Sequence, residues 1–192
     1  MTSYAGRFII SRGQECTLGT SPLVSSHVSM KRSSKSVINP GIRESMWEGL
    51  ILGTSSLVSG ELLNVGVDRY LVMSVTSDAS SGELAWYGAK TNVELHHYRY
   101  VESTDASNNI VQAWSPLAVS VAAYGQIVTT ELRQFDPGLL DSSKYVFWIP
   151  SSLGLQELDR LVMGENNYQV DAVDDVMLDG VDRVQAGSDV RL

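Results

Sequence analysis

Three histidines and one cysteine are the side chains in this sequence best suited to catalysis or metal binding. His96 and His97 are adjacent in a segment that alternates like a β-strand, so their side chains are expected on opposite faces, where they cannot chelate one metal ion. His27 stands alone in a serine-rich stretch, and no G-x-S-x-G elbow or comparable motif accompanies any histidine. Cys16 has no second cysteine to pair with, and we expect a small buried apolar side chain rather than a catalytic thiol.

An acidic run near the C-terminus is the other candidate for metal binding. Its carboxylates are Asp171, Asp174, Asp175, Asp179 and Asp182. Their spacing does not match the D-x-D-x-D-G calcium loop, and the interleaved valines are typical of a solvated strand face followed by a turn. The sequence also has no G-x-G-x-x-G or Walker phosphate-binding loop. We therefore predict a protein that is not an enzyme and has no metal and no cofactor.

The composition predicts a folded chain with an uneven charge. Of its 192 residues, 43% are hydrophobic and 19% are charged, which is typical of globular proteins. Residues 1–103 hold nine basic and nine acidic side chains, whereas residues 104–192 hold 5 basic and 13 acidic ones and carry the whole net charge of -8. A chain of this kind does not bind DNA phosphates, which requires a clustered basic face. One short basic cluster is expected to be a solvated loop or a partner contact; it consists of Lys31, Arg32 and Lys35.

Two patterns used for sorting to membranes are missing from the sequence. No run approaches the roughly 20 apolar residues that a membrane-spanning helix needs. The segment Met1–Arg12 does not show an apolar core followed by a small-residue cleavage site. We therefore expect a soluble protein that is not exported and has no membrane partner.

Period-2 alternation of β-branched and aromatic residues predicts a mostly β protein. The clearest strand segments are 69–75, 83–87, 93–100, 126–133, 145–149 and 168–173. Residues 42–52 suit either a short helix or a strand, and the serine-rich stretches 20–36 and 54–59 are expected to be exposed connections. Many short strands separated by Asx- and glycine-containing turns indicate small barrels or sandwiches.

An internal repeat at an offset of 98 residues divides the chain. Leu63, Gly66, Tyr70, Val72, Val75 and Gly82 recur as Leu161, Gly164, Tyr168, Val170, Val173 and Gly180. The leucine ends one strand, the glycine closes a turn at positive φ, and Tyr-x-Val-x-x-Val lays one face of the return strand onto a core. Each copy is expected to end at an arginine, Arg99 or Arg191, and GQECTL (13–18) and GQIVTT (125–130) are expected to share an entry position. The sequence thus predicts two related all-β modules with minor α content, residues 1–103 and 104–192, each a small barrel or sandwich with long loops.

The second copy resembles the head-completion or stopper proteins of tailed bacteriophages. The matching positions are Asp159, Leu161, Gly164, Tyr168, Val170, Val173 and Arg191. The first copy matches more loosely, at Glu61, Leu63, Gly66, Tyr70, Val72, Val75 and Arg99. This chain departs from most stoppers in carrying two modules, and its stretch from His27 to Gly60 is longer than the expected entry loop.

The resemblance implies a structural protein of the virion neck, assembled in the host cytoplasm. Such proteins form a homo-oligomeric ring, here six-fold or twelve-fold, between the portal or adaptor and the tail. DNA passes through the acidic channel without specific binding. A loop that reaches into the channel would come from residues 19–41, 115–123 or 134–143.

Two other functions remain open at this stage. A tail terminator or a baseplate β-module would also be a structural β protein that functions in a larger assembly. A ligand-binding or carbohydrate-binding β-domain is suggested by aromatic residues, although in β proteins such side chains more often form the core. These aromatics are Trp47, Trp86, Tyr87, Trp114, Trp148 and Tyr168.

Overall fold

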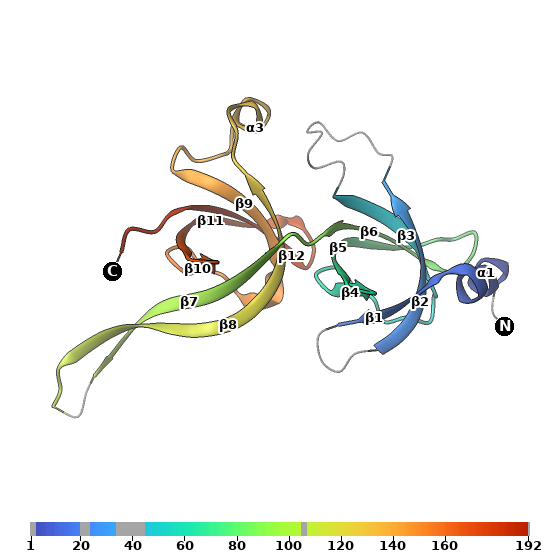
Figure 1. Ribbon diagram of the computed structural model, residues 1–192, viewed down its shortest axis with the longest axis horizontal. Coiled ribbons are helices and arrows are strands. Elements are labelled where there is room, and N and C mark those ends of the chain that lie inside the picture. Colours follow the sequence, from blue (N-terminus) through green and yellow to red (C-terminus); the bar gives the residue numbers. More distant parts are fainter. Residues whose placement is uncertain (1–2, 20–23, 34–44, 105–106, 192) are drawn as a thin grey trace. The chain divides into compact units, whose positions relative to one another are not determined.

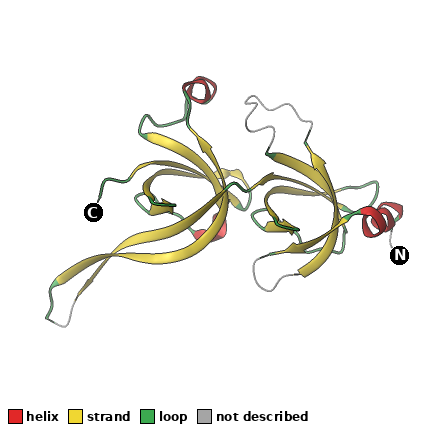
Figure 2. Ribbon diagram, in the orientation of Figure 1, coloured by secondary structure: helices red, strands yellow, loops and turns green. Residues whose placement is uncertain are grey.

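The chain folds into two closed antiparallel barrels of six strands each, as a computed structural model shows (Figure 1). The structure describes residues 3–19, 24–33, 45–104 and 107–191. Strands account for most of these residues, and helices are short (Figure 2). The all-β, two-module fold expected from the alternation pattern is therefore confirmed, and both modules are barrels.

The two barrels have the same strand order. The first consists of β1 (Gln14–Leu18), β2 (Val24–Arg32), β3 (Met46–Ile51), β4 (Leu62–Val65), β5 (Asp68–Ser77) and β6 (Leu84–Lys90), joined as β1-β2-β3-β6-β5-β4. The second consists of β7 (Val93–Thr104), β8 (Ile110–Ile127), β9 (Ser143–Pro150), β10 (Arg160–Met163), β11 (Asn166–Leu178) and β12 (Val181–Ser188), joined as β10-β11-β12-β9-β8-β7. Replacing each strand of the first barrel by the strand six places later in the chain reproduces the order of the second.

The repeated residues occupy equivalent positions in the two barrels. Leu63 lies opposite Tyr70 across β4 and β5, and Leu161 lies opposite Tyr168 across β10 and β11. The turn glycines match as well, because Gly66 and Gly164 have φ of 59° and 60°. Only glycine adopts this backbone region without steric cost.

Backbone hydrogen bonds before the hairpins repeat at the same offset. The Val72 amide donates to the Glu61 carbonyl at 3.0 Å, and the Val170 amide donates to the Asp159 carbonyl at 2.9 Å. Each acidic side chain also accepts a hydrogen bond from the amide three residues earlier in the chain, that of Val58 or Gln156. The similarity of the two copies therefore extends to how the chain enters each hairpin.

Each barrel has its own hydrophobic core. The core of the first contains Leu18, Val28, Ile51, Leu63, Tyr70, Val72 and Trp86. The core of the second contains Leu95, Phe147, Ile149, Leu161, Tyr168, Val170 and Val184. Val75 and Val173 are partly buried against these cores, so the Tyr-x-Val-x-x-Val face points inward in both copies.

The division of the chain lies ahead of residue 103. Residues 1–91 and 175–181 form one compact unit, and residues 92–174 and 182–192 form the other. The strand β7 belongs to the second barrel because it pairs with β8 and β10. Arg99 therefore lies in the first strand of the second barrel and does not close the first module.

The proposed match between the two GQ segments is wrong. Gln14–Leu18 forms β1, the first strand of its barrel, whereas Gly125 to Ile127 end β8, the second strand of the other barrel. The structural counterpart of β1 is β7, since each pairs with the leucine strand of its barrel. The short sequence match is coincidental.

Two helices occur where the sequence pattern did not indicate them. The first, α1 (Tyr4–Arg12), begins at Ser3, whose hydroxyl accepts a hydrogen bond from the Gly6 amide. The second, α3 (Thr130–Phe135), begins within the segment 126–133 that was expected to be a strand, of which only residues 126 and 127 belong to β8. Its cap Thr129 accepts a hydrogen bond from the Leu132 amide. In both cases a side-chain cap satisfies an amide at the helix start, which the alternation pattern does not register.

Two strands occur where loops were expected. The serine-rich segment 20–36 contains β2, in which serines take strand positions facing the β1 and β3 neighbours. Residues 115–123, a candidate channel loop, lie within the long strand β8. Residues 46–51 form β3, which resolves the choice between helix and strand there, while residues 34–44 lie outside the described part.

Candidate functional site

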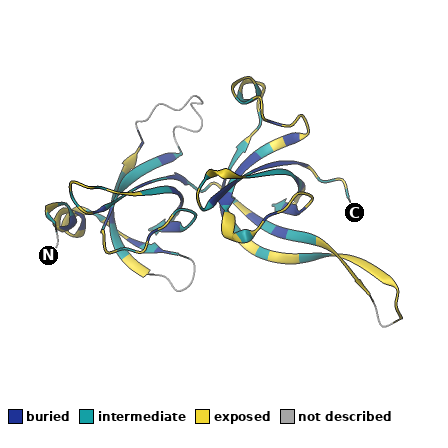
Figure 3. Ribbon diagram, turned by 180° about the vertical axis from the view of Figure 1, so that it is seen from behind, coloured by how far each residue is buried: buried dark blue, intermediate teal, exposed yellow. Residues whose placement is uncertain are grey.

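A two-stranded hairpin projects from the second barrel. The strand β7 pairs with β10 only at residues 96–98, but it continues to pair with β8 as far as Thr104. We call residues 99–104 and 110–115 the arm. Figures 1 and 3 show the arm extending away from the barrel, with its outer part exposed. Among the described residues, each arm strand has the other as its only sheet neighbour.

The arm carries exposed apolar side chains and little charge. Tyr100, Val101, Ile110 and Val111 are all exposed, and Ile110 is 72% exposed. Strand alternation places Tyr100, Glu102 and Ile110 on one face and the two valines on the other. A two-stranded ribbon of this kind is marginally stable in water by itself.

The base of the arm is irregular. The β7–β8 register shifts on both sides of His97, and Ser120 in β8 has a φ of 57°. Bulges of this kind bend a strand and increase its twist. Pro116 lies opposite Tyr98 and has no amide hydrogen to offer a neighbouring strand. The hairpin therefore leaves the barrel wall at a position set by local backbone geometry.

A buried carboxylate holds the arm at its base. The Asp159 side chain is 3% exposed and accepts hydrogen bonds from Arg99 Nε at 2.8 Å and Arg99 Nη2 at 2.7 Å. The His97 Nε2 atom lies 2.8 Å from the same carboxylate, and the Gln156 amide donates to it at 2.9 Å. Burial alone would raise the pKa of Asp159, but the hydrogen bonds from Arg99, Gln156 and His97 outweigh it, so the pKa is lowered.

A second buried carboxylate ties the C-terminal segment to the arm. The Asp189 side chain is 0% exposed and accepts from Arg160 Nε at 2.6 Å and from Arg191 Nε at 2.8 Å. The guanidinium carbon of Arg160 lies 3.8 Å from the ring centroid of Trp114, and that of Arg191 lies 4.9 Å from it. Trp114 is an arm residue whose ring also contacts Tyr100, at 5.1 Å between centroids. These cation–π contacts fix the aromatic side chain at the base of the arm.

We call the set Arg99, Asp159, Arg160, Asp189, Arg191 and Trp114 the clamp. Both of its carboxylates are occupied by arginines in charge-assisted hydrogen bonds, which removes them from use as general bases. The clamp connects β7, β8, β10 and the segment after β12. Its geometry suits positioning of the arm rather than catalysis.

The clamp predicts a pH-dependent stability. Burial alone would raise the pKa of Asp189, but hydrogen bonds from Arg191 and Arg160 lower it to about 2. The ordinary pKa of an unfolded aspartate is about 3.9, so this carboxylate contributes about 2 to 3 kcal/mol of stability above that pH. The contribution is lost as pH falls through about 2. Denaturant unfolding of the wild type and of Asp189→Asn should therefore show a free-energy difference that shrinks as pH falls from about 5 to about 2.

Asp141→Asn is the control for this measurement, because the Asp141 carboxylate is fully exposed. Its difference from the wild type should stay near zero at every pH. A gap between the wild type and Asp189→Asn that does not change with pH would contradict the assignment of the Asp189 carboxylate as ionised and paired.

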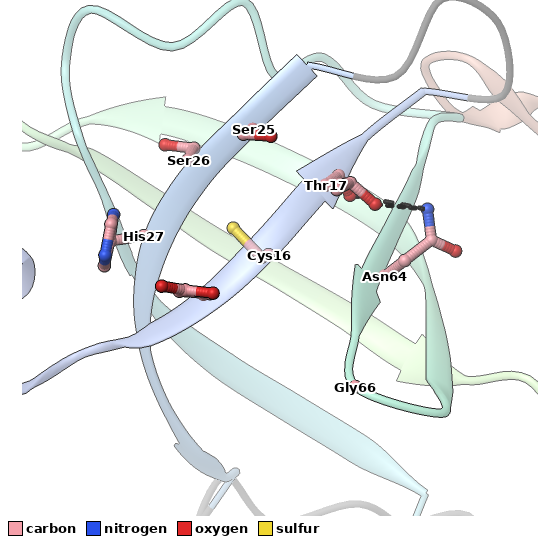
Figure 4. A pocket seen from close by; sticks show the side chains of 8 residues that line it. Cys16, Thr17, Ser25, Ser26, His27, Asn64 and Gly66 are labelled. Carbon is pink, nitrogen blue, oxygen red and sulfur yellow. Dashed lines mark hydrogen bonds between the residues drawn. The ribbon is translucent and has the colours of Figure 1, made fainter.

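The first barrel contains a different candidate, an open pocket of about 410 Å³ (Figure 4). Cys16 from β1 and His27 from β2 lie on its wall, together with Glu15, which is directly opposite His27 in the sheet. Cys16 is 3% exposed, and its burial raises the pKa of the thiol to about 11. The thiol is therefore protonated at neutral pH and is not a ready nucleophile. Cys16 packs in the core of the first barrel, as expected.

The structure also places the basic cluster named from the sequence. Lys31 and Arg32 lie at the end of β2, where Lys31 Nζ is 3.5 Å from Glu48. The guanidinium of Arg32 lies 5.9 Å from the Trp47 ring. Lys35 lies outside the described residues. The two described members make contacts within the first barrel and do not form an extended basic face.

The structure brings together two arginines that the sequence assigned to separate modules. Arg99 and Arg191 both belong to the clamp of the second barrel. Sequence reasoning missed Trp114 and Asp189 as members of the clamp, and His97 as a further partner of Asp159. Asp159 was named as a motif residue, but nothing in the local pattern indicated that it would meet Arg99, which is 60 residues away in the chain.

The described residues hold neither a metal-binding cluster nor a membrane-spanning helix. In that part of the chain, no group of three or more histidine, cysteine, aspartate or glutamate side chains is placed to hold a metal ion. None of the helices that the structure describes has the length and apolarity to cross a membrane. Among the aromatic residues considered for ligand binding, Trp86 and Tyr168 are buried in the two cores.

Comparisons with known proteins find no sequence match and a weak structural similarity to MrkH. No family model and no curated protein matches the sequence. Among solved structures, MrkH of K. pneumonia is similar at 6% sequence identity and a TM-score of 0.21, over 97% of this chain and 81% of that one. A TM-score this low does not establish a shared fold, so nothing about MrkH is transferred to this chain.

Proposed function

We propose that this protein is a structural, non-enzymatic component of the neck of a tailed bacteriophage virion. In this role it forms a homo-oligomeric ring between the portal or adaptor and the tail, with DNA passing through the channel. The motif resemblance at Asp159, Gly164, Tyr168 and Arg191 suggests the family. The observation that carries the proposal is the arm, a hairpin with exposed apolar side chains that is held at its base by buried ion pairs and has no further sheet partner among the described residues.

The arm supports an assembly role because an isolated protein with such a hairpin is prone to uncontrolled association. An exposed ribbon with unpaired edges invites uncontrolled association, and single-domain proteins usually shorten or cover it. Here the clamp instead holds the base of the hairpin with two buried ion-paired carboxylates. We infer that the ion pairs stabilise an exposed apolar hairpin so that it can bind a partner.

The charge distribution fits a channel protein. The unit formed by residues 92–174 and 182–192 holds 13 acidic and 6 basic side chains, and the unit formed by residues 1–91 and 175–181 holds 9 acidic and 8 basic ones. The formal charges are therefore -7 and -1, so most of the net negative charge belongs to the second barrel. A ring multiplies this acidity around its opening, and the resulting negative potential keeps DNA from adhering.

The proposal is tested with purified protein, followed by light scattering after size exclusion and by electron microscopy. The wild type is expected to form rings, alone or on portal–adaptor or tail preparations. A variant in which residues 101–113 are replaced by an Asn-Gly turn, which joins the facing residues Tyr100 and Trp114, should keep a cooperative unfolding transition but lose assembly. A wild type that stays monomeric and binds none of these preparations would contradict the neck assignment.

The same experiment separates the related structural roles. Binding to portal–adaptor rings favours a stopper, and binding to tail tubes favours a terminator or another tail part. In both cases the shortened variant should lose binding, because the arm is the proposed interface.

A further inference from the structure

Exposed large apolar side chains gather on two elements of the chain. Within the described residues, only the β7–β8 hairpin and α1 carry three or more of them. On the hairpin they are Tyr100, Val101, Ile110, Val111, Leu117 and Val119, and on α1 they are Tyr4, Phe8 and Ile10. The two elements belong to different units of the chain. They are therefore two distinct adhesive surfaces on one molecule.

The exposed face of α1 is aromatic and basic. Tyr4 is 85% exposed and Phe8 is 53% exposed, while Ile9 on the opposite face is buried. Arg7 and Arg12 are exposed beside the two aromatic rings, and the helix contains no acidic residue. An amphipathic helix normally turns its apolar stripe inward, so aromatic rings on the outer face indicate a second contact surface.

One face of the arm is complementary to this helix. It presents Tyr100 and Ile110 together with Glu102, whose carboxylate is held by Gln112. The apolar groups of the two surfaces match in kind, and the charges are opposite in sign. Opposite charges around an apolar contact select one pairing and disfavour arm against arm or helix against helix.

The dimensions also agree. The nine residues of α1 span about 13 Å at 1.5 Å per residue. The free part of β7, residues 99–104, spans about 20 Å at about 3.3 Å per residue. The helix can therefore lie along the arm within its free length. The two aromatic side chains of the helix, Tyr4 and Phe8, are 85% and 53% exposed and supply most of the apolar area of this contact.

We propose that the arm of one copy docks on α1 of the next copy through the face that carries Tyr100, Glu102 and Ile110. This inference rests on the proposed assembly function and names the partner of the arm as a second copy of the chain. The contact is heterologous because the two surfaces differ, and repeated heterologous contacts generate a ring when the rotation between copies closes and an open filament when it does not. Each copy then contributes one arm and receives another.

Two interface variants test the pairing. Phe8→Asp removes the helix surface and leaves the arm intact, whereas Ile110→Asp removes the arm surface and leaves the helix intact. Each variant alone should be monomeric in light scattering at concentrations where the wild type assembles. An equimolar mixture should form heterodimers and nothing larger, because the one intact arm meets the one intact helix and neither end can extend further.

Val111→Asp is the matched control, since Val111 neighbours Ile110 but lies on the other face of the arm. It should assemble like the wild type. Phe135→Asp, at an exposed phenylalanine on α3, controls for the added charge and should also assemble.

The outcomes separate this inference from the proposed function. If the wild type assembles but the mixed variants remain monomeric, the arm binds another surface, and the helix–arm pairing is overturned while the assembly proposal stands. If Phe8→Asp assembles like the wild type, α1 is not the receptor and the pairing is likewise overturned. If the wild type stays monomeric and also binds neither portal–adaptor rings nor tails, both proposals are overturned together.

Discussion

Replacing Asp159 by alanine is expected to lower the free energy of unfolding of the second barrel by about 3 to 5 kcal/mol. The carboxylate is 3% exposed and holds Arg99 through two hydrogen bonds, with His97 as a further partner. Its removal leaves the buried His97 ring without its carboxylate partner and releases Arg99. Breaking a buried pair in this way costs far more than the pair itself contributes, because the remaining polar group cannot be resolvated.

The internal repeat supplies the control for Asp159→Ala. Glu61 occupies the equivalent position in the first barrel, where its carboxylate accepts a hydrogen bond from the Val58 amide at an exposed site. Glu61→Ala should therefore cost no more than about 1.5 kcal/mol. Denaturant unfolding gives both values, and hydrogen exchange of the β7 and β10 amides assigns the Asp159 loss to the second barrel. Equal losses for the two variants would show that the Asp159 network contributes nothing beyond its local turn.

Phe147→Ala is expected to destabilise the second barrel by about 3 to 5 kcal/mol as well. Phe147 is fully buried and lies opposite Gly125 across β8 and β9. A Cβ atom at Gly125 would come within 2.9 Å of the ring, so the ring fills the space above the glycine. Alanine at position 147 leaves this space empty, and the facing glycine has no side chain to close it.

Phe135→Ala provides the comparison for this substitution. Phe135 on α3 is 62% exposed, so its truncation should change the free energy of unfolding by no more than about 0.5 kcal/mol. Thermal and denaturant unfolding of the two variants give the contrast. A loss below about 1 kcal/mol for Phe147→Ala would mean that the barrel repacks around the missing ring.

The pairing of glycine with an aromatic residue recurs in the first barrel. Trp47 lies opposite Gly88, and Trp86 lies opposite Gly49, across β3 and β6. A Cβ atom at Gly88 would approach the Leu71 carbonyl oxygen to 2.3 Å. Glycine thus permits close approach of neighbouring strands where a small barrel bends, and the facing ring covers the exposed backbone. The same glycine–aromatic pairing therefore occurs in both barrels.

The sequence was sufficient for the features that depend on local chemistry. Alternation in segments such as 69–75 and 168–173 predicted β5 and β11, since period 2 places one side of a strand in the core. Gly66 and Gly164 marked the turns, because their positive φ disfavours other residues. The offset of 98 residues predicted two related modules, and each forms a closed barrel of the same strand order. The helices α1 and α3 were missed, since their caps are single hydrogen bonds that leave no periodic signal.

Only the tertiary structure decided the module boundary and the candidate site. The segment 93–100 was read correctly as a strand, but its membership of the second barrel depends on pairing with β10, more than 60 residues away. The clamp likewise joins Arg99 to Asp159 and Trp114 to Arg160 and Arg191. Such contacts form between segments whose local patterns are independent, so no spacing in the sequence records them. The arm could not be predicted from the sequence either. It exists because β7 and β8 extend beyond the neighbouring strands, and the ends of those strands are known only from the folded structure.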